Sequence, residues 1–135
     1  MVLVIAALVL TLVGTSISRS ISGAEMRTAA RKLAASMRYT RTRAILSKSE
    51  QVFLVDTGNR KYTAAERAPV ELPEGMEVLL TTARSELTSE TVGGIRFYPD
   101  GGSTGGSVKL EANERIYTIN VGWLTGEASV QREDQ

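Results

Sequence analysis

The first 13 residues of the chain form an uninterrupted apolar run. They carry no charge, and Thr11 is their only polar side chain. The run is too short to cross a bilayer alone, because about 20 apolar residues are needed to span the hydrocarbon core. It fits the core of a signal peptide, a buried helix of a soluble domain, or the end of a membrane helix that begins before Met1. We favour the membrane helix, since helical periodicity continues after the run and no proline interrupts the chain before Pro69.

A second helical pattern follows and continues to about residue 48. Apolar and small residues recur at alternating steps of four and three, which places them on one stripe of a helix with basic residues on both flanks. We expect the rest of the chain to cover this half of the helix. The stripe and the apolar residues that precede it form a predicted helix seam, whose members are Leu3, Leu8, Ile17, Ile21, Met26, Ala30, Leu33, Met37 and Ala44.

Beyond residue 49 the pattern changes to short strands separated by turn residues. Two tight hairpins are predicted, one around residues 57–60 and one at Asn113 and Glu114. Residues 70–72 are interpreted as an extended connection and residues 85–94 as a polar loop. The predicted strands are residues 51–56, 61–63, 76–82, 95–98, 107–112, 116–121 and 127–130.

One long helix followed by successive strands predicts an α+β fold, in which the amphipathic half of the helix packs on an antiparallel sheet. At 135 residues the chain suits one compact domain. We therefore divide it into a hydrophobic helix segment at residues 1–22, a truncated membrane anchor, and a head at residues 23–135. The head contains the amphipathic helix, residues 23–48, and the sheet region, residues 50–131.

The net charge of +1 conceals two oppositely charged parts of the chain. Residues 19–48 hold eight basic residues and one acidic residue, Glu25, which gives this stretch a charge of +7 and leaves −6 for the remainder. Such asymmetry is typical of a surface for nucleic acid or lipid, or of a basic stalk that packs among acidic heads in an assembly.

The chain contains no Cys and no His, which restricts its chemistry. Disulfides, thiolate nucleophiles, imidazole bases and the common zinc ligand sets are excluded. The Ser and Thr hydroxyls have no imidazole to activate them, and no pair of carboxylates is singled out by its spacing. We predict that the protein is not an enzyme and has no cofactor and no metal.

The most distinctive segment, residues 95–106, runs from a predicted strand into a glycine-rich turn. By itself it predicts a hairpin loop, because Pro99 ends the strand, Asp100 can accept hydrogen bonds from nearby amides, and the glycines permit positive φ. A phosphate-binding loop is disfavoured because no Lys-Ser or Lys-Thr pair follows, and a calcium loop because no second carboxylate is suitably spaced. The motif residues are Ile95, Phe97, Pro99, Asp100, Gly101, Gly102, Thr104, Gly105 and Gly106.

These segments, in this order, resemble the H-type minor pseudopilins of type II secretion systems and the related minor type IV pilins. The resemblance rests on the apolar start, on the Ala- and Arg-rich helix at residues 27–38, and on Arg-Phe-Tyr-Pro-Asp-Gly-Gly-Ser-Thr-Gly-Gly at residues 96–106. The last of these is the most specific. Trp123, in a Gly-Trp-Leu-Thr-Gly stretch, is also similar to that group, although a single Trp is more often part of a core.

The resemblance implies a single-pass subunit of the bacterial inner membrane, held in lipid by its N-terminal helix, with its head in the periplasm. It also implies assembly with other minor and major pseudopilins at the tip of a pseudopilus, in contact with the secretion apparatus. The helix seam would then pack against neighbouring subunits. In the family a prepilin peptidase removes a basic leader, and no such processing site can be assigned in this sequence.

The alternative is a minor type IV pilin that binds DNA during uptake and neutralises phosphates with its basic residues. Nucleic acid is the less favoured partner for two reasons. Most of the surplus positive charge lies on a helix that we expect to be half covered, and residues 131–135 carry more acidic than basic groups.

Overall fold

The structure is a computed structural model that describes residues 21–134, without the side chain of Asp134. In this part of the chain one α-helix, α2 (Gly23–Ser47), is followed by eight strands and one short 3₁₀ helix, η1 (Arg84–Glu86). The strands are β1 (Gln51–Asp56), β2 (Lys61–Thr63), β3 (Val70–Glu71), β4 (Glu77–Thr81), β5 (Val92–Phe97), β6 (Gly106–Ala112), β7 (Arg115–Val121) and β8 (Ala128–Asp134).

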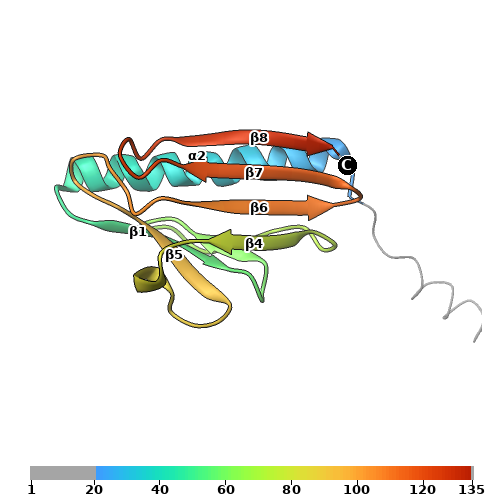
Figure 1. The fold of residues 1–135 in the computed structure, drawn as a ribbon, viewed down its shortest axis with the longest axis horizontal. Helices are drawn as coiled ribbons and strands as arrows, with labels where there is room; N and C mark the ends of the chain where they lie inside the picture. The colour runs from blue at the N-terminus through green and yellow to red at the C-terminus, as the bar shows by residue number, and fades with distance from the viewer. Residues whose placement is uncertain (1–20, 135) are drawn as a thin grey trace, which may run out of the picture.

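The strands form two four-stranded antiparallel sheets, in the orders β3-β2-β1-β5 and β4-β6-β7-β8. The helix α2 lies behind β6, β7 and β8 in Figure 1 and also contacts β1 and β5 of the first sheet. The predicted α+β fold is therefore confirmed, with the sheet divided into two. The start of α2 and the end of β8 lie at one end of the molecule, and the C-terminal end of α2 lies at the other, which we call the distal end (Figure 1).

Local hydrogen bonds explain where α2 begins and ends. The Ser22 side chain accepts a hydrogen bond from the backbone N–H of Glu25 at 3.1 Å, which caps the first turn. At the other end Lys48 adopts a left-handed conformation with φ of 54°, and its N–H bonds to the carbonyl of Ala44. The observed helix thus agrees within one residue with the amphipathic helix predicted at 23–48.

The apolar face of α2 forms one side of a core that both sheets share. In β1 the side chains of Phe53 and Val55 are buried while Leu54 between them is exposed, as strand alternation requires. Burying each large apolar side chain stabilises the fold by about 1.5–3 kcal/mol. The fully buried side chains of the core include Met26, Leu33 and Met37 of α2, Phe53, Val55, Ile95 and Phe97 of the first sheet, and Val108, Leu110 and Ile119 of the second.

Both predicted hairpins are confirmed. Strands β6 and β7 pair from Ala112↔Arg115 onwards, and the residues between them, Asn113 and Glu114, both have positive φ (51° and 64°), as in a type I′ turn. In the β1–β2 turn, Asp56 accepts hydrogen bonds from the side chain and the backbone N–H of Asn59, at 2.9 and 3.0 Å. These hydrogen bonds lower the pKa of Asp56.

Some predicted boundaries differ from the structure. Val70 and Glu71, expected to be an extended connection, pair with β2 as the short strand β3. The expected polar loop at 85–94 contains part of η1 and the start of β5 at Val92. Strand β8 extends to Asp134 instead of ending at residue 130, because its main chain continues to pair with β7 where its side chains become polar.

The glycine-rich segment at 95–106 is not a simple hairpin, because β5 belongs to the first sheet and β6 to the second. Its first part does fold back on β5, where the N–H of Thr104 donates to the carbonyl of Arg96 at 2.9 Å. The chain then passes to the other sheet at Gly106, where the backbone lies so close to the carbonyl of Thr81 that a Cβ atom would clash. The segment therefore joins the two sheets.

Candidate assembly surface

The helix seam lies inside the head wherever the structure describes it. Ile21 is 3% exposed, and Met26, Ala30, Leu33, Met37 and Ala44 are 0% exposed. These side chains pack in the core of the protein itself, so the expectation that they contact neighbouring subunits does not hold for them. Leu3, Leu8 and Ile17 lie outside the described residues, and their role stays a prediction.

The glycine-rich segment is held in place by its own hydrogen bonds. Asp100 accepts from the N–H of Gly102 at 2.9 Å, as expected for a turn, and the N–H of Gly101 donates to the carbonyl of Tyr98 at 2.9 Å. Thr104 accepts from the N–H of Arg96 at 3.0 Å. Of the other motif residues, Ile95 and Phe97 are buried, Pro99 is exposed, and Gly101, Gly105 and Gly106 have positive φ while Gly102 does not.

This segment packs against the loop between β7 and β8 at the distal end. The carbonyl of Gly101 accepts a hydrogen bond from Arg41 Nε of α2 at 2.9 Å. Gly126 has a φ of +68°, and a Cβ atom there would collide with the same carbonyl. Because glycine alone permits this approach, the motif fixes two loops and the end of α2 as one unit.

Two large apolar side chains are exposed on that unit. Trp123 and Leu124 lie in the β7–β8 loop and are 70% and 72% exposed. The backbone at Gly122 and Trp123 is held in place, since the N–H and hydroxyl of Ser103 donate to the carbonyls of Trp123 and Gly122 at 2.8 and 2.9 Å. A single Trp is more often part of a core, but Trp123 is not a core residue. We call Trp123 and Leu124 the distal apolar pair; rigidly held, exposed apolar residues are typical of protein contact sites.

Sequence reasoning did not place Leu124 in any site. The available signal was the position of Trp123 and Leu124 between Gly122 and Gly126, because a turn this short leaves little room to fold both side chains inward.

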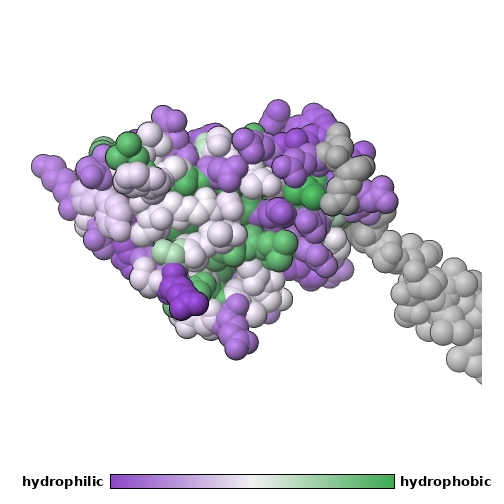
Figure 2. Space-filling view, in the orientation of Figure 1, coloured by the Kyte–Doolittle hydropathy of each residue, from purple (hydrophilic) through white to green (hydrophobic). Residues whose placement is uncertain are grey.

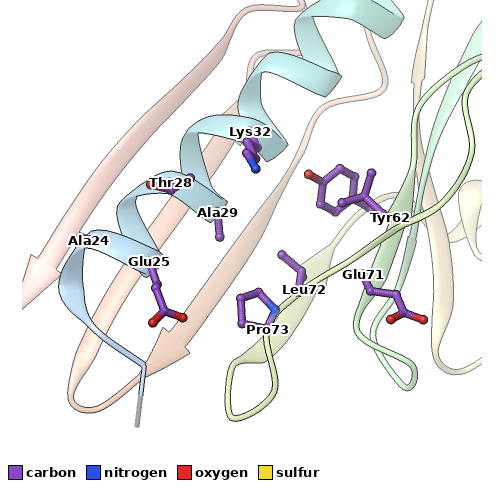
Figure 3. A pocket seen from close by; sticks show the side chains of 10 residues that line it. Ala24, Glu25, Thr28, Ala29, Lys32, Tyr62, Glu71, Leu72 and Pro73 are labelled. Atoms are coloured by element: carbon purple, nitrogen blue, oxygen red, sulfur yellow. The ribbon is translucent and has the colours of Figure 1, made fainter. Parts of the chain in front are cut away.

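A shallow hollow of about 370 Å³ lies between the start of α2 and residues 70–73 (Figure 3). Figure 3 shows Ala29 and Lys32 of α2 on one side and Leu72 and Tyr62 on the other. Burial raises the pKa of Tyr62, and a hydrogen bond with the side chain of Ser36 opposes this rise. Burial therefore favours the neutral phenol of Tyr62.

In the described part of the chain, residues 21–134, no cluster of three or more acidic, His or Cys side chains is placed to hold a metal ion. Over the same residues no helix has both the length and the apolar character needed to cross a membrane. Figure 2 shows polar and apolar side chains interspersed over the face of the head, without a single large apolar area.

The chain is similar to known proteins of bacterial transport. The family model of the type II transport protein GspH matches residues 29–125. The type II secretion system protein H of Xanthomonas campestris pv. campestris is 38% identical over 129 residues, which covers 94% of this chain and 76% of that protein.

Solved structures that share this fold include a minor pseudopilin and a type IV minor pilin. The minor pseudopilin EpsH from the type 2 secretion system of Vibrio cholerae has a TM-score of 0.61 at 12% identity, with 82% of this chain and 97% of that chain covered. The type IV minor pilin FimU of Pseudomonas aeruginosa has a TM-score of 0.60 at 12% identity, with 79% and 88% covered. At these identities the likeness concerns the fold alone, whereas the sequence match covers most of the chain, and this chain belongs to the family of the type II transport protein GspH.

Proposed function

We propose that this chain is a minor pseudopilin that assembles with other pseudopilins at the tip of the pseudopilus of a type II secretion system. The observation that carries the proposal is the match to the GspH family over residues 29–125, together with the relative of 38% identity. Residues 1–22 would anchor the subunit in the inner membrane, and the head, residues 23–135, would lie in the periplasm. Its activity would be assembly and not catalysis.

The architecture supports an assembling role. The seam of α2 is occupied by the two sheets of the head, so contacts between heads must use other surfaces. The distal apolar pair is the most exposed apolar feature of the described residues, and it sits on loops fixed by Arg41 and Ser103. An exposed Trp on a backbone that is already held in place suits a binding hot spot, because less backbone entropy is lost when a partner covers it.

The DNA-binding alternative has less support. Several basic side chains that would be needed for phosphates are already engaged within the head. Arg41 donates to the carbonyl of Gly101, Arg38 donates to the carbonyl of Ala128 at 2.9 Å, and Arg43 forms an ion pair with Glu66 at 3.0 Å. The sequence match is to a secretion family, and the FimU likeness concerns the fold alone.

The proposal is tested in a bacterium that encodes this chain, by deleting its gene and restoring either the wild type or Trp123→Ala/Leu124→Ser. Deletion should stop secretion of the proteins that use the type II pathway, and the wild type should restore it. The double variant should fold normally, because both side chains are exposed. It should capture the other minor pseudopilins at least about thirtyfold less in co-purification, since truncating a hot-spot Trp costs about 2 kcal/mol or more.

Leu79→Ser is the matched control, because Leu79 is also exposed but lies on β4, away from the distal end. It should leave co-purification within about twofold of the wild type, as for a residue outside a hot spot. Normal secretion after deletion of the gene would refute the proposed function. Equal losses in the two variants would instead refute the role of the distal apolar pair.

A further inference from the structure

A basic groove runs between α2 and the edge strand β8. It has a volume of about 620 Å³ and is lined by Arg27, Arg31, Arg38, Tyr117, Val130 and Arg132. The three arginines of α2 follow the length of the helix, and Arg27 and Arg38 are about 16 Å apart along its axis at 1.5 Å per residue. The arginines therefore line the groove over a length that suits an extended segment.

The first half of α2 supplies two exposed arginines to this groove. Arg27 and Arg31 are exposed and form no ion pair with any side chain that the structure describes. Further along, Arg38 and Arg41 line an adjoining hollow with Glu127, yet no ion pair joins Glu127 to either of them among the described residues. A ligand of opposite charge would thus meet the guanidinium groups of Arg27 and Arg31, whereas those of Arg38 and Arg41 already donate to main-chain carbonyls.

The free edge of β8 supplies main-chain groups beside these arginines. The N–H of Gly122 donates to the carbonyl of Glu127 at 3.1 Å, so by strand alternation Ala128 and Val130 direct their main-chain groups away from β7. The outward carbonyl of Ala128 already accepts a hydrogen bond from the Arg38 side chain. The N–H and C=O of Val130 have no main-chain partner on the outer side within residues 21–134, and such an edge is a template for another strand.

We propose that this groove binds an extended, acidic segment of a neighbouring pseudopilin, whose backbone pairs with the edge of β8 and whose carboxylates pair with Arg27 and Arg31. The identity of the neighbour rests on the proposed function. Charge complementarity supports an acidic occupant, because residues 19–48 carry +7 and the rest of the chain −6, so a neighbour of similar design presents carboxylates. The planar fork of an arginine pairs with a carboxylate through two hydrogen bonds.

The geometry favours a protein segment over the other polyanions. A flat lipid surface across one end of α2 would reach Arg27 but not Arg38, because the arginines are spread along the helix and not across its end. A nucleic acid would use the guanidinium groups but would leave the main chain of Val130 unpaired. An extended acidic segment accounts for the charge, the length of the groove and the free strand edge together.

The test compares two double variants of the full chain, each produced together with the other pseudopilins of its secretion system. Arg27→Glu/Arg31→Glu reverses two charges in the groove. Lys32→Glu/Arg84→Glu reverses two exposed charges outside it and serves as the matched control. A photo-crosslinking residue at Gln131 on β8 reports the occupant, and circular dichroism confirms that each variant is folded. The groove variant should lose crosslinking to a pseudopilin about tenfold, and the control should stay within about twofold of the wild type.

The crosslinked partner peptide, identified by mass spectrometry, should contain at least two Asp or Glu residues, and changing those to Lys should restore crosslinking to the groove variant. Equal crosslinking in groove variant and control would overturn this inference alone. A groove variant that loses binding to phosphatidylglycerol vesicles or to a DNA duplex, with pseudopilin crosslinking unchanged, would also overturn it. If the wild type captures no pseudopilin at all, the proposed function falls together with the inference.

Discussion

Tyr62 shows how burial changes the chemistry of one side chain. Its ring is almost fully buried and stacks on Phe53 with ring centroids 5.5 Å apart. Burial disfavours the phenolate, so the pKa of Tyr62 is raised in the folded state. A group with a raised folded pKa contributes stability that is present below its unfolded pKa and is lost as the pH rises through the folded value.

We therefore expect the free energy of unfolding of the full chain to fall as the pH rises above about 10, the ordinary pKa of tyrosine. In Tyr62→Phe this fall should be smaller, because the phenylalanine keeps the contact with Phe53 and has no proton to lose. Urea denaturation at pH 8 and pH 11, followed by far-ultraviolet circular dichroism, measures the difference. The same pH dependence in both proteins would contradict the role of burial.

Individual residues also show which contacts could be predicted from the sequence and which could not. It anticipated that Asp100 would bind a nearby amide, because this depends on a residue two positions away. It did not anticipate that Gly126 would pack against Gly101, because their contact joins positions 25 residues apart in the chain. It also favoured a buried Trp123, whereas the loop that carries this residue turns outward.

At the scale of elements, Arg96 links three segments of the head. It extends from β5 to Glu86 of η1 and to Glu50, which precedes β1, with N–O distances of 3.1 Å in both ion pairs. The carboxylate of Glu86 is nearly buried, since its side chain is 8% exposed, while that of Glu50 is 53% exposed. The hydrogen bond to Glu86 is the main cause of the raised pKa of Arg96.

Arg96→Leu should lower the free energy of unfolding by about 1–3 kcal/mol, because the nearly buried Glu86 would lose its only ion pair among the described residues. Glu50→Gln removes the exposed partner and should cost less than about 0.5 kcal/mol. Urea denaturation of the full chain distinguishes the two variants. If both variants lost the same amount of stability, the burial of Glu86 would not matter.

At the scale of the whole molecule, α2 holds the two sheets together. Leu33 is fully buried in the core that the helix shares with both sheets. The helix therefore stabilises the head with the same residues that sequence analysis assigned to neighbour contacts. Assembly must then rely on surfaces that remain outside, of which the distal apolar pair and the basic groove are the two that we propose.

Leu33→Ala should destabilise the full chain by about 2–5 kcal/mol, as expected when a cavity opens in a packed core. Lys32→Ala, at the adjacent exposed position, should change stability by less than about 0.5 kcal/mol. Leu33→Glu should prevent the head from folding, so a loss of incorporation in that variant would not identify an interface. A folded Leu33→Glu protein that fails only in assembly would show instead that the helix seam does contact neighbours.

The sequence by itself determined the helix, most strands and both hairpins, because these depend on periodicity and on turn residues within a few positions. It also indicated the family, because the glycine-rich motif at residues 95–106 is contiguous in the chain. Only the tertiary structure decided that the strands form two sheets, that the glycine-rich segment joins them, and that the seam residues between Ile21 and Ala44 are buried inside the head. The physical reason is that each of these depends on which distant surfaces bury one another, and an apolar stripe looks the same whether its partner is the chain itself or a neighbour.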